Sequence, residues 1–460
     1  MFRRPLEFLK TLPAQGDLVE IRLGPRRAWM VCHPELVHRM LRDTRTFDKG
    51  GPQYERLRAL MGDGIVTCPH AEHRRQRRLL QPTFRPAGVA AHTDVMAQEA
   101  ESLCRDWRGG QQVDVSAATL SLTTRMISRL LLSDSLGPAA TDEVRHCLAA
   151  IVRGLFVRTV VPVDALFRLP TPANRRYRRA VERVPELIDA AVTERRRSAP
   201  RDDLLGLLLA SAEDGGAPVT DREVRDQLVS LLLTGSESPS MCLASAFSLL
   251  AQHPEVERRL HAEVDSVLAG RLPDADDLPR LVYTRSVLTE TLRHSPPGWL
   301  FTRVTTMETE LAGRRLPRGT TVLYSPYLLH HDPASFPEPD RFLPERWLDG
   351  EAAAGPHGAL IPFAAGNRKC IGDLFSMAEM TVALATVAGR WRLHHPAGRV
   401  APPRPGATLG PRSLTMICTS RADAPGGAAP QAVALAPGAA TAASGVEKSR
   451  RDGDNGVHHA

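Results

Sequence analysis

The sequence predicts a mainly α-helical single domain with small β-sheets. Most of the 460 residues follow a hydrophobic period near 3.6, which indicates amphipathic helices. Only residues 17–31 and 308–333 alternate apolar and polar side chains as strands do. One helix, expected from Asp221 to Gln252, would be about 48 Å long at 1.5 Å per residue and would cross the whole molecule.

The strand-like stretches come first and late in the chain. In the first, alternation stops at Gly24-Pro25, resumes as far as Val31, and gives way to helical spacing after Pro34. This pattern predicts a hairpin followed by a helix. The second stretch, residues 308–333, has two glycines at turn positions, Gly313 and Gly319.

The long central helix has clear ends and an unusual middle. Thr220 with Glu223 forms a capping box at its start, and His253-Pro254 stops it. Its middle reads "TGSESPS", residues 234–240, where apolar residues would be expected. Pro239 lacks the N–H that would bond the Gly235 carbonyl, so we expect a local break there; the alternative is two helices joined at the proline.

Composition excludes several classes of protein. No run of eighteen apolar residues occurs, and "MFRRP" is followed by no apolar core, so we expect neither a membrane span nor a signal peptide and place the protein in the cytoplasm. The seven cysteines have no ligand-like spacing, which favours reduced thiols. We expect one domain over residues 1–421 and a disordered Ala/Gly/Pro-rich tail over residues 422–460.

A cysteine near the C-terminus has an unusual setting, "PFAAGNRKCIGDLFSMAEM", residues 362–380. Cys370 stands just before a helix and beside Arg368 and Lys369, a setting that favours its thiolate. The glycines around it would let the backbone approach something large and flat. The stretch resembles the haem-binding signature of the cytochrome P-450 family, Phe-x-x-Gly-x-Arg-x-Cys-x-Gly, and matches it at every fixed position.

The resemblance implies a cofactor, haem b, and a cytochrome P-450 fold in which the long central helix passes over the haem. Cys370 would be the axial iron ligand, and a thiolate ligand favours O–O cleavage. Arg368 would pair with a haem propionate, as would His73, Arg77 and Arg303, which stand in "HAEHRRQRR" and "WLFTRV".

Further family marks follow in the expected order. "ETLR" supplies Glu290 and Arg293, which can pair on one helical face, and "FLPERW" supplies Arg346. The resemblance implies that these three residues form a buried structural network. In the central helix it implies that Glu237 and Ser238 are the catalytic acid and alcohol that deliver protons to bound oxygen. The alcohol is usually threonine, and serine lacks the methyl group that restricts its rotamers.

The resemblance also implies an activity. Segments such as "VLYSPYLLHHDP" are similar to bacterial monooxygenases that hydroxylate sesquiterpenes, so we expect oxygen from O2 to be inserted into a C–H bond of a cyclic terpene. Two alternatives remain, a peroxide-driven oxygenase of the same fold and a haem protein without turnover. An apolar pocket would suit a hydrocarbon; its tentative lining residues are Thr234, Gly235, Trp299, Leu300 and Phe301.

The expected partners follow from charge and family. Electrons would come from NAD(P)H through ferredoxin reductase and a ferredoxin, and the arginines of residues 74–78 suit an acidic electron carrier. No aromatic residues are interleaved with these arginines, so we expect no nucleic-acid binding. We expect a monomer. Family members usually have a proline-rich segment before the first helix, whereas this chain opens with "MFRRPLEFLKTL", so we expect a less stable first sheet.

Overall fold

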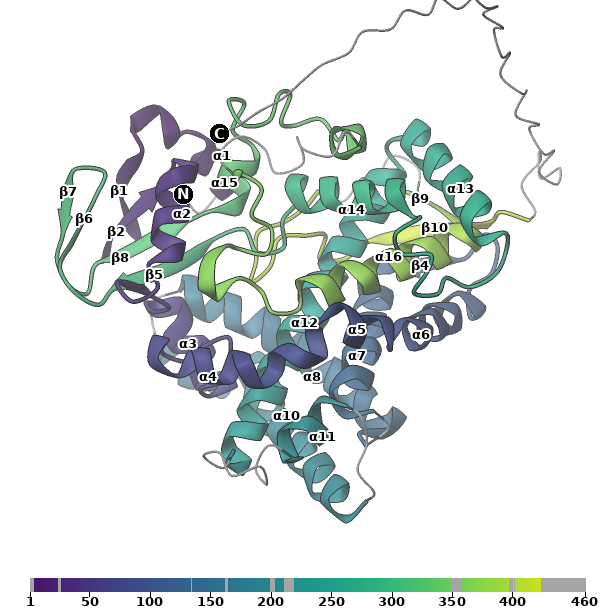
Figure 1. The fold of residues 1–460 in the computed structure, drawn as a ribbon, viewed down its shortest axis with the longest axis horizontal. Helices are drawn as coiled ribbons and strands as arrows, with labels where there is room; N and C mark the ends of the chain where they lie inside the picture. The colour runs from purple at the N-terminus through teal and green to yellow at the C-terminus, as the bar shows by residue number, and fades with distance from the viewer. Residues whose placement is uncertain are drawn as a thin grey trace, which may run out of the picture.

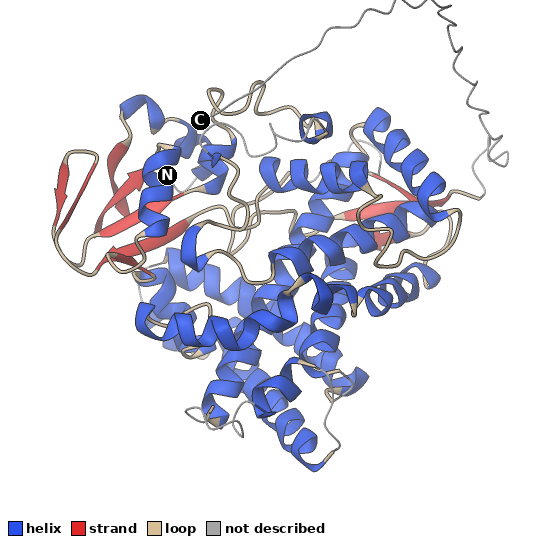
Figure 2. Cartoon of the chain, viewed as in Figure 1, coloured by secondary structure: helices blue, strands red, loops and turns tan. Residues whose placement is uncertain are grey.

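The computed structural model describes residues 4–23, 26–133, 135–161, 164–198, 203–210, 219–348, 358–396, 400 and 402–422. Helices dominate, and the strands form small sheets at two sides of the helical body (Figures 1 and 2). The mainly α prediction is therefore confirmed. The helices are α1 Pro5–Lys10, α2 Pro34–Arg42, α3 Pro52–Met61, α4 His70–Leu80, α5 Pro86–Ala90, α6 Thr93–Arg105, α7 Val115–Leu132, α8 Gly137–Val160, α9 Asp164–Arg168, α10 Pro172–Arg197, α11 Leu204–Ala210, α12 Asp221–Leu250, α13 Pro254–Leu268, α14 Val282–His294, α15 Pro326–His330 and α16 Asp373–Arg390.

The largest sheet has five strands in the order β1-β2-β8-β5-β3. β1 and β2 form the antiparallel hairpin expected from alternation, with Leu18 opposite Val31, and α2 follows as predicted. The turn residues Gly24-Pro25 lie outside the described part of the chain. The strands are β1 Leu18–Leu23, β2 Arg26–Val31, β3 Phe47–Asp48, β5 Phe301–Thr305 and β8 Thr321–Tyr324.

Two smaller sheets complete the strands. β6 Thr309–Leu311 and β7 Arg314–Leu316 form a hairpin that turns at Gly313, where φ is +71°. At the opposite side of the molecule, β10 Thr415–Ser420 pairs with β4 Gln112–Asp114 and β9 Trp391–His394 (Figure 1).

The long central helix, α12, runs through the middle of the molecule (Figure 1). Its start is capped as expected, because the Thr220 hydroxyl accepts a hydrogen bond from the Glu223 N–H. The helix ends at Leu250, two residues before the predicted end. Pro239 lies within one continuous helix, so the alternative of two separate helices is wrong, and the expected break does not interrupt the helical backbone. Every residue from Pro239 to Leu250 is buried, because α7, α14 and α16 pack around this half.

The N-terminal sheet is well packed, so the structure does not show the less stable first sheet that we expected. Leu9 and Leu12 are almost fully buried in a cluster with Met30 and Leu323 of the sheet. The predicted tail falls almost entirely outside the described residues, which end at Ala422. Among the described helices, none is long and apolar enough to span a bilayer.

Candidate functional site

Cys370 stands on a loop that folds back on itself just before α16. The Cys370 N–H donates to the Phe363 carbonyl (2.9 Å), and the Lys369 N–H donates to the Gly366 carbonyl (3.1 Å). Gly366 has a φ of +69°, and a Cβ there would lie 2.2 Å from the Leu41 carbonyl oxygen of α2. The close approach of α2 therefore requires glycine at this position.

The thiol of Cys370 has two properties that together define its position. The residue is exposed to solvent, yet burial among protein atoms is the largest influence on its pKa. Protein atoms therefore crowd around the Cys370 sulfur although the residue stays accessible to a ligand.

The expectation that the protein alone favours the Cys370 thiolate is wrong. Burial raises the pKa of the thiol, and Asp373 raises it further, against the lowering effects of the Gly372 N–H, Lys49 and Arg77. The two basic neighbours in sequence do not help, because Lys369 pairs with Asp373 (2.5 Å) and Arg368 points elsewhere. A metal ion bound to the sulfur would deprotonate it.

Buried cations from distant segments gather in this region. Arg303 on β5 is 1% exposed and bonds only neutral groups, the Thr302 carbonyl (2.8 Å) and the hydroxyls of Tyr54 (3.2 Å) and Tyr324 (3.5 Å). Among the described residues no carboxylate pairs with Arg303, and its Nε has no partner. A buried guanidinium without a counter-ion is costly, so the site favours an added anion.

Two further cations surround Arg303. Lys49 donates to the Val66 carbonyl (2.8 Å), and burial, followed by repulsion from Arg303 and Arg368, lowers its pKa to about 7. Arg368 pairs with Asp48 (2.9 Å) and donates to the Cys68 carbonyl (3.0 Å), while its Nε has no partner. Asp48 thus provides one negative charge beside the basic side chains of Arg303, Lys49 and Arg368.

His73 and Arg77 bring α4 to the same region. They lie one turn apart, as predicted, and Arg77 donates to the Lys369 carbonyl of the cysteine loop (2.6 Å). His73 is buried, and its pKa is lowered to about 3 by burial and by repulsion from Arg368, Lys49 and Arg77. The structure thus gathers all five expected cofactor-binding residues, His73, Arg77, Arg303, Arg368 and Cys370.

These residues fit the group that the sequence implies. Haem carries two propionates, and the excess buried positive charge together with the unpartnered Nε atoms of Arg303 and Arg368 suits a dianion. A cysteine beside the same cations suits the iron. The sequence argument missed Lys49, Asp48, Tyr54 and Tyr324, which come from separate segments and carry no local motif.

On α12, Glu237 and Ser238 differ in their partners. Glu237 is half-buried, and its Oε1 accepts a hydrogen bond from the Thr408 hydroxyl (2.8 Å). Burial raises the pKa of the Glu237 carboxyl, while Thr408 and then Arg412 lower it. Ser238 is half-buried, and its hydroxyl makes no hydrogen bond to another of the described residues.

The neighbouring hydroxyls of α12 are already used. Thr234 donates to the Ser230 carbonyl (2.8 Å), and Ser236 donates to the Leu232 carbonyl (2.7 Å). Such bonds to the preceding turn satisfy a hydroxyl within its own helix. Ser238 is therefore the exception in this run, as a catalytic alcohol requires.

Gly235 allows α12 to approach α7. A Cβ at this position would lie 2.8 Å from Cγ1 of Ile127, closer than side chains pack. Near the same point, the Thr123 hydroxyl of α7 donates to the Ser236 carbonyl (2.7 Å). Close packing of two helices thus explains the glycine, which the sequence analysis assigns to the pocket.

The expected structural network is present as a geometric unit. Glu290 and Arg293 on α14 are both fully buried and make a bidentate pair at 2.8 and 2.9 Å. Arg346 reaches Glu290 at 3.2 Å, and the Trp347 indole N–H donates to the second carboxylate oxygen (2.9 Å). Arg293 also donates to the carbonyls of His330, Pro339 and Arg341, and Arg346 to those of Pro337 and Glu338. The network therefore joins α14 to the segment before the cysteine loop.

The three apolar residues after α14 have core partners. Trp299 is 8% exposed, packs with Leu9 and Leu12, and donates its indole N–H to the Gly406 carbonyl (3.0 Å). Leu300 packs against the same cluster, and Phe301 begins β5 and stacks on Tyr324. These contacts give them a structural role, and the tentative pocket assignment gains no support from them.

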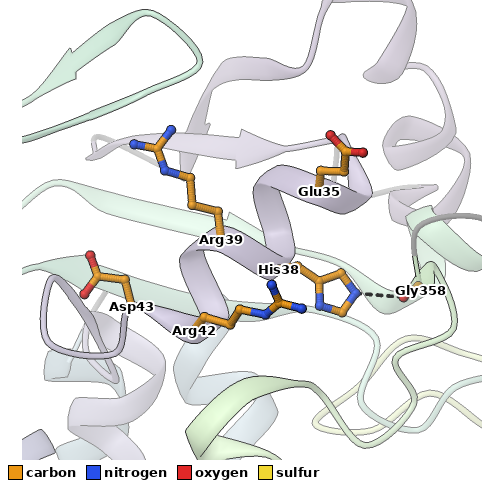
Figure 3. Close-up of a pocket in the computed structure, with 6 residues that line it drawn as sticks. All are labelled: Glu35, His38, Arg39, Arg42, Asp43 and Gly358. Carbon is orange, nitrogen blue, oxygen red and sulfur yellow. Dashed lines mark hydrogen bonds between the residues drawn. The ribbon is translucent and has the colours of Figure 1, made fainter. Parts of the chain in front are cut away.

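An open surface groove beside α2 lies apart from these residues. It is lined by Glu35, His38, Arg39, Arg42, Asp43 and Gly358, and the His38 ring bonds the Gly358 carbonyl at 2.9 Å (Figure 3). Its lining is polar and charged, and none of the predicted site residues belongs to it. We therefore do not assign the reaction to this groove.

Comparison with known proteins identifies the family and relatives of this chain. A model of the family "Cytochrome P450" matches residues 4–418. "Cyclooctat-9-en-7-ol 5-monooxygenase" of Streptomyces melanosporofaciens is 47% identical over 433 residues, covering 92% of each chain. "Cyclooctatin synthase" of the same organism is 46% identical, covering 91% of this chain and 92% of its own. "Pentalenene oxygenase" of Streptomyces avermitilis is 40% identical, covering 92% of this chain and 94% of its own.

A solved structure shows the same fold. The crystal structure of the cytochrome P450DA heme domain superposes with a TM-score of 0.81 at 26% identity, covering 91% of this chain and 93% of its own. The family match extends over nearly all the described residues, and the family implies haem iron. This chain therefore belongs to the cytochrome P450 family.

Proposed function

We propose that this protein is a haem-thiolate monooxygenase that inserts one oxygen atom from O2 into a C–H bond of a cyclic terpene. The observation that carries the proposal is the group of under-compensated cations that lies close to Cys370. Such a site suits a dianionic iron-containing cofactor. The Glu237–Ser238 pair on α12 supports oxygen activation as the chemistry.

In this proposal the chain holds haem through both charge and sulfur. Cys370 would be the axial ligand, and Arg303, Arg368 and Lys49 would bind the propionates together with His73 and Arg77. Haem with a thiolate ligand supplies the cleavage of the O–O bond. Propionates near Lys49 would also raise its pKa, so that it binds as a cation.

The proton-delivery residues would be Glu237 and Ser238. The free Ser238 hydroxyl can donate a hydrogen bond to bound oxygen, and Glu237 can pass protons towards it. Keeping this pair distinguishes the proposal from a peroxide-driven enzyme, which needs no proton supply for splitting O2. The partner-free hydroxyl favours the O2-dependent activity.

The substrate proposal rests on the relatives. Their printed names refer to pentalenene, to cyclooctat-9-en-7-ol and to cyclooctatin. The second of these names denotes an alcohol, so we extend the expected substrates from sesquiterpene hydrocarbons to cyclic terpenes that already carry a hydroxyl. Which ring and which carbon are oxidised would be read from the product.

We further propose that a ferredoxin and a ferredoxin reductase supply electrons from NAD(P)H. Bacterial members of this family typically use separate redox partners. Arg74, Arg75 and Arg78 are exposed on α4, and the next arginine of that helix, Arg77, contacts the cysteine loop. An acidic carrier would therefore find positive charge close to the thiolate side of the site. All seven cysteines are free thiols, which suits a monomer in the cytoplasm.

The ligand assignment can be tested by absorption spectroscopy. The reduced, CO-bound protein should show the band of a thiolate-ligated haem, and Cys370→Ser should lose it. Cys147→Ser removes a half-buried thiol on α8 and should keep the band. A band that survives in Cys370→Ser would refute the assignment.

The activity needs a second experiment. Cyclic terpene hydrocarbons and terpene alcohols should be titrated for a spin-state shift, and any ligand that shifts the spectrum should be tested with ferredoxin, reductase and NADPH. Ser238→Ala should release more peroxide per NADPH consumed. Equal coupling in Ser238→Ala and wild type would show that the hydroxyl has no part in oxygen activation.

A further inference from the structure

A loop near the C-terminus reaches the acid of α12. Residues 402–414 lead into β10, and a bridge between Arg404 and Gly410 closes the loop so that Thr408 stands near its tip. The Thr408 hydroxyl donates to Oε1 of Glu237 at 2.8 Å. No local motif in the sequence links these two residues, which are 171 positions apart.

The position of Thr408 is fixed by its neighbours. Leu409 is fully buried, and its N–H donates to the Pro297 carbonyl (2.9 Å). On the other side, the Gly406 carbonyl accepts from the Trp299 indole N–H (3.0 Å). A Cβ on Gly410 would lie 3.0 Å from Met241 of α12, so the loop packs closely against this helix. The hydroxyl is therefore held in place beside Glu237 before any ligand binds.

The same loop supplies a positive charge. Arg412 interacts electrostatically with Glu237, and its guanidinium lies 5.3 Å from the ring centroid of Phe156 on α8. The other charges that act on Arg412 are Arg153 and Arg404, and both repel it. Glu237 is thus the carboxylate whose charge acts on Arg412 in the described part of the chain.

The two side chains suit the two protonation states of a proton-transfer acid. A threonine hydroxyl can donate to the carboxylate and can accept from the protonated acid, so Thr408 can bond Glu237 in either state. The guanidinium donates only, and it stabilises the carboxylate alone. Without these groups, burial would favour the protonated acid.

We propose that Thr408 and Arg412 are positioning residues that hold the Glu237 carboxyl and keep it able to exchange protons. For each proton delivered, Glu237 releases a proton on the Ser238 side and takes one back from solvent on the loop side, so the carboxyl returns to its starting form; this happens twice in each turnover of O2. This inference rests on the proposed function, in which Glu237 delivers protons. It adds the outer part of the path, formed by residues 402–414.

The test uses the haem-loaded enzyme and two changes at one position. Thr408→Val keeps the branched shape and removes the hydroxyl, whereas Thr408→Ser keeps the hydroxyl. The carbonyl stretch of protonated Glu237, identified by its loss in Glu237→Gln, should be followed by infrared spectroscopy as a function of pH. Thr408→Val removes a hydrogen bond to a charged group, so the Glu237 carboxyl should bind its proton about tenfold more tightly and titrate at higher pH. Thr408→Ser should restore the wild-type titration.

The control is Thr386→Val on α16, which removes another buried threonine hydroxyl, bonded to the Val382 carbonyl at 2.8 Å. It should leave the titration of Glu237 unchanged. Arg412→Gln should shift the titration in the same direction as Thr408→Val, because it removes a charge that favours the carboxylate. If Thr408→Val titrates like wild type, the inference is overturned.

Turnover separates this inference from the proposed function. Glu237→Gln and Thr408→Val should both release more peroxide per NADPH consumed, while Thr408→Ser and Thr386→Val should match wild type. Unchanged coupling in Glu237→Gln would refute proton delivery by Glu237, and with it the proposed role of the pair. Uncoupling in Glu237→Gln with normal coupling in Thr408→Val would refute only the role of the loop.

Discussion

Glu290→Gln should destabilise the fold far more than its single-atom change suggests. The carboxylate accepts five hydrogen bonds, from two nitrogens of Arg293, from Arg346, from the Leu343 N–H and from the Trp347 indole. A glutamine amide would replace one carboxylate oxygen by an NH2 group, and this donor would then face the N–H donors that bond that oxygen in the wild type. It would also leave the fully buried Arg293 without its counter-ion.

The expected cost follows from these losses. Removing one partner of a buried ion pair costs about 3–5 kcal/mol, because the remaining charge is left uncompensated. A fold with about 5–15 kcal/mol of total stability would lose a large fraction of it. The measurement is urea unfolding followed by far-UV circular dichroism, with free energies compared at equal slope.

The chain contains a matched control for this experiment. Glu338 and Arg341 have the same i,i+3 spacing and a pair distance of 2.7 Å, but both side chains are exposed. Glu338→Gln should leave the unfolding midpoint within experimental error, because solvent screens such a pair. If Glu290→Gln shifts the midpoint no more than Glu338→Gln does, burial of the network is not what makes it stabilising.

Three further outcomes follow from particular contacts. Arg77→Gln should speed haem loss to an acceptor protein by about tenfold or more, because one charge-assisted hydrogen bond is lost. Arg78 is an exposed neighbour on the same helix, and Arg78→Gln should leave the rate of haem loss unchanged. Glu379 is buried with an unpartnered Oε2, and its pKa is raised well above 4.5, so the folded protein holds a proton that the unfolded chain gives up and stability falls as pH rises above 4.5. Glu379→Gln should therefore stabilise the protein more at pH 8 than at pH 5 in urea unfolding. An equal gain at both pH values would contradict this. Gly235→Ala should cost about 1–3 kcal/mol through its clash with Ile127, and Ile127→Ala in the same chain should recover part of it in a double-mutant cycle.

Local patterns were enough to predict much of the fold. Alternation gave the β1–β2 hairpin, and a capping box with a following His-Pro gave α12 to within two residues. β5 was missed because its residues, Phe301–Thr305, follow α14 directly and pair with strands from distant parts of the chain. Strand pairing of this kind is decided by tertiary contacts and leaves little local signal.

The site shows a different limit. Residues that belong to a contiguous motif, such as Cys370 and Arg368, were found, whereas Lys49, Tyr54 and Thr408 were not. Each of these three sits in an unremarkable stretch and becomes informative only when the fold sets it beside Arg303 or Glu237. The sequence shows which side chains exist, but the partner of each one depends on packing.

Whether Cys370 is a thiol or a thiolate also depends on how packing pairs its neighbours. A helix start and two basic neighbours argued for a thiolate, yet Arg368 pairs with Asp48 and Lys369 pairs with Asp373, so neither charge stabilises the sulfur. Burial then raises the pKa of the thiol. Because Arg303 also lacks a counter-ion among the described residues, the protein alone satisfies neither the sulfur nor this arginine. A ligand that brings a metal to Cys370 and two carboxylates to Arg303 and Lys49 would resolve both at once, so binding of haem should couple deprotonation of the thiol to charge compensation.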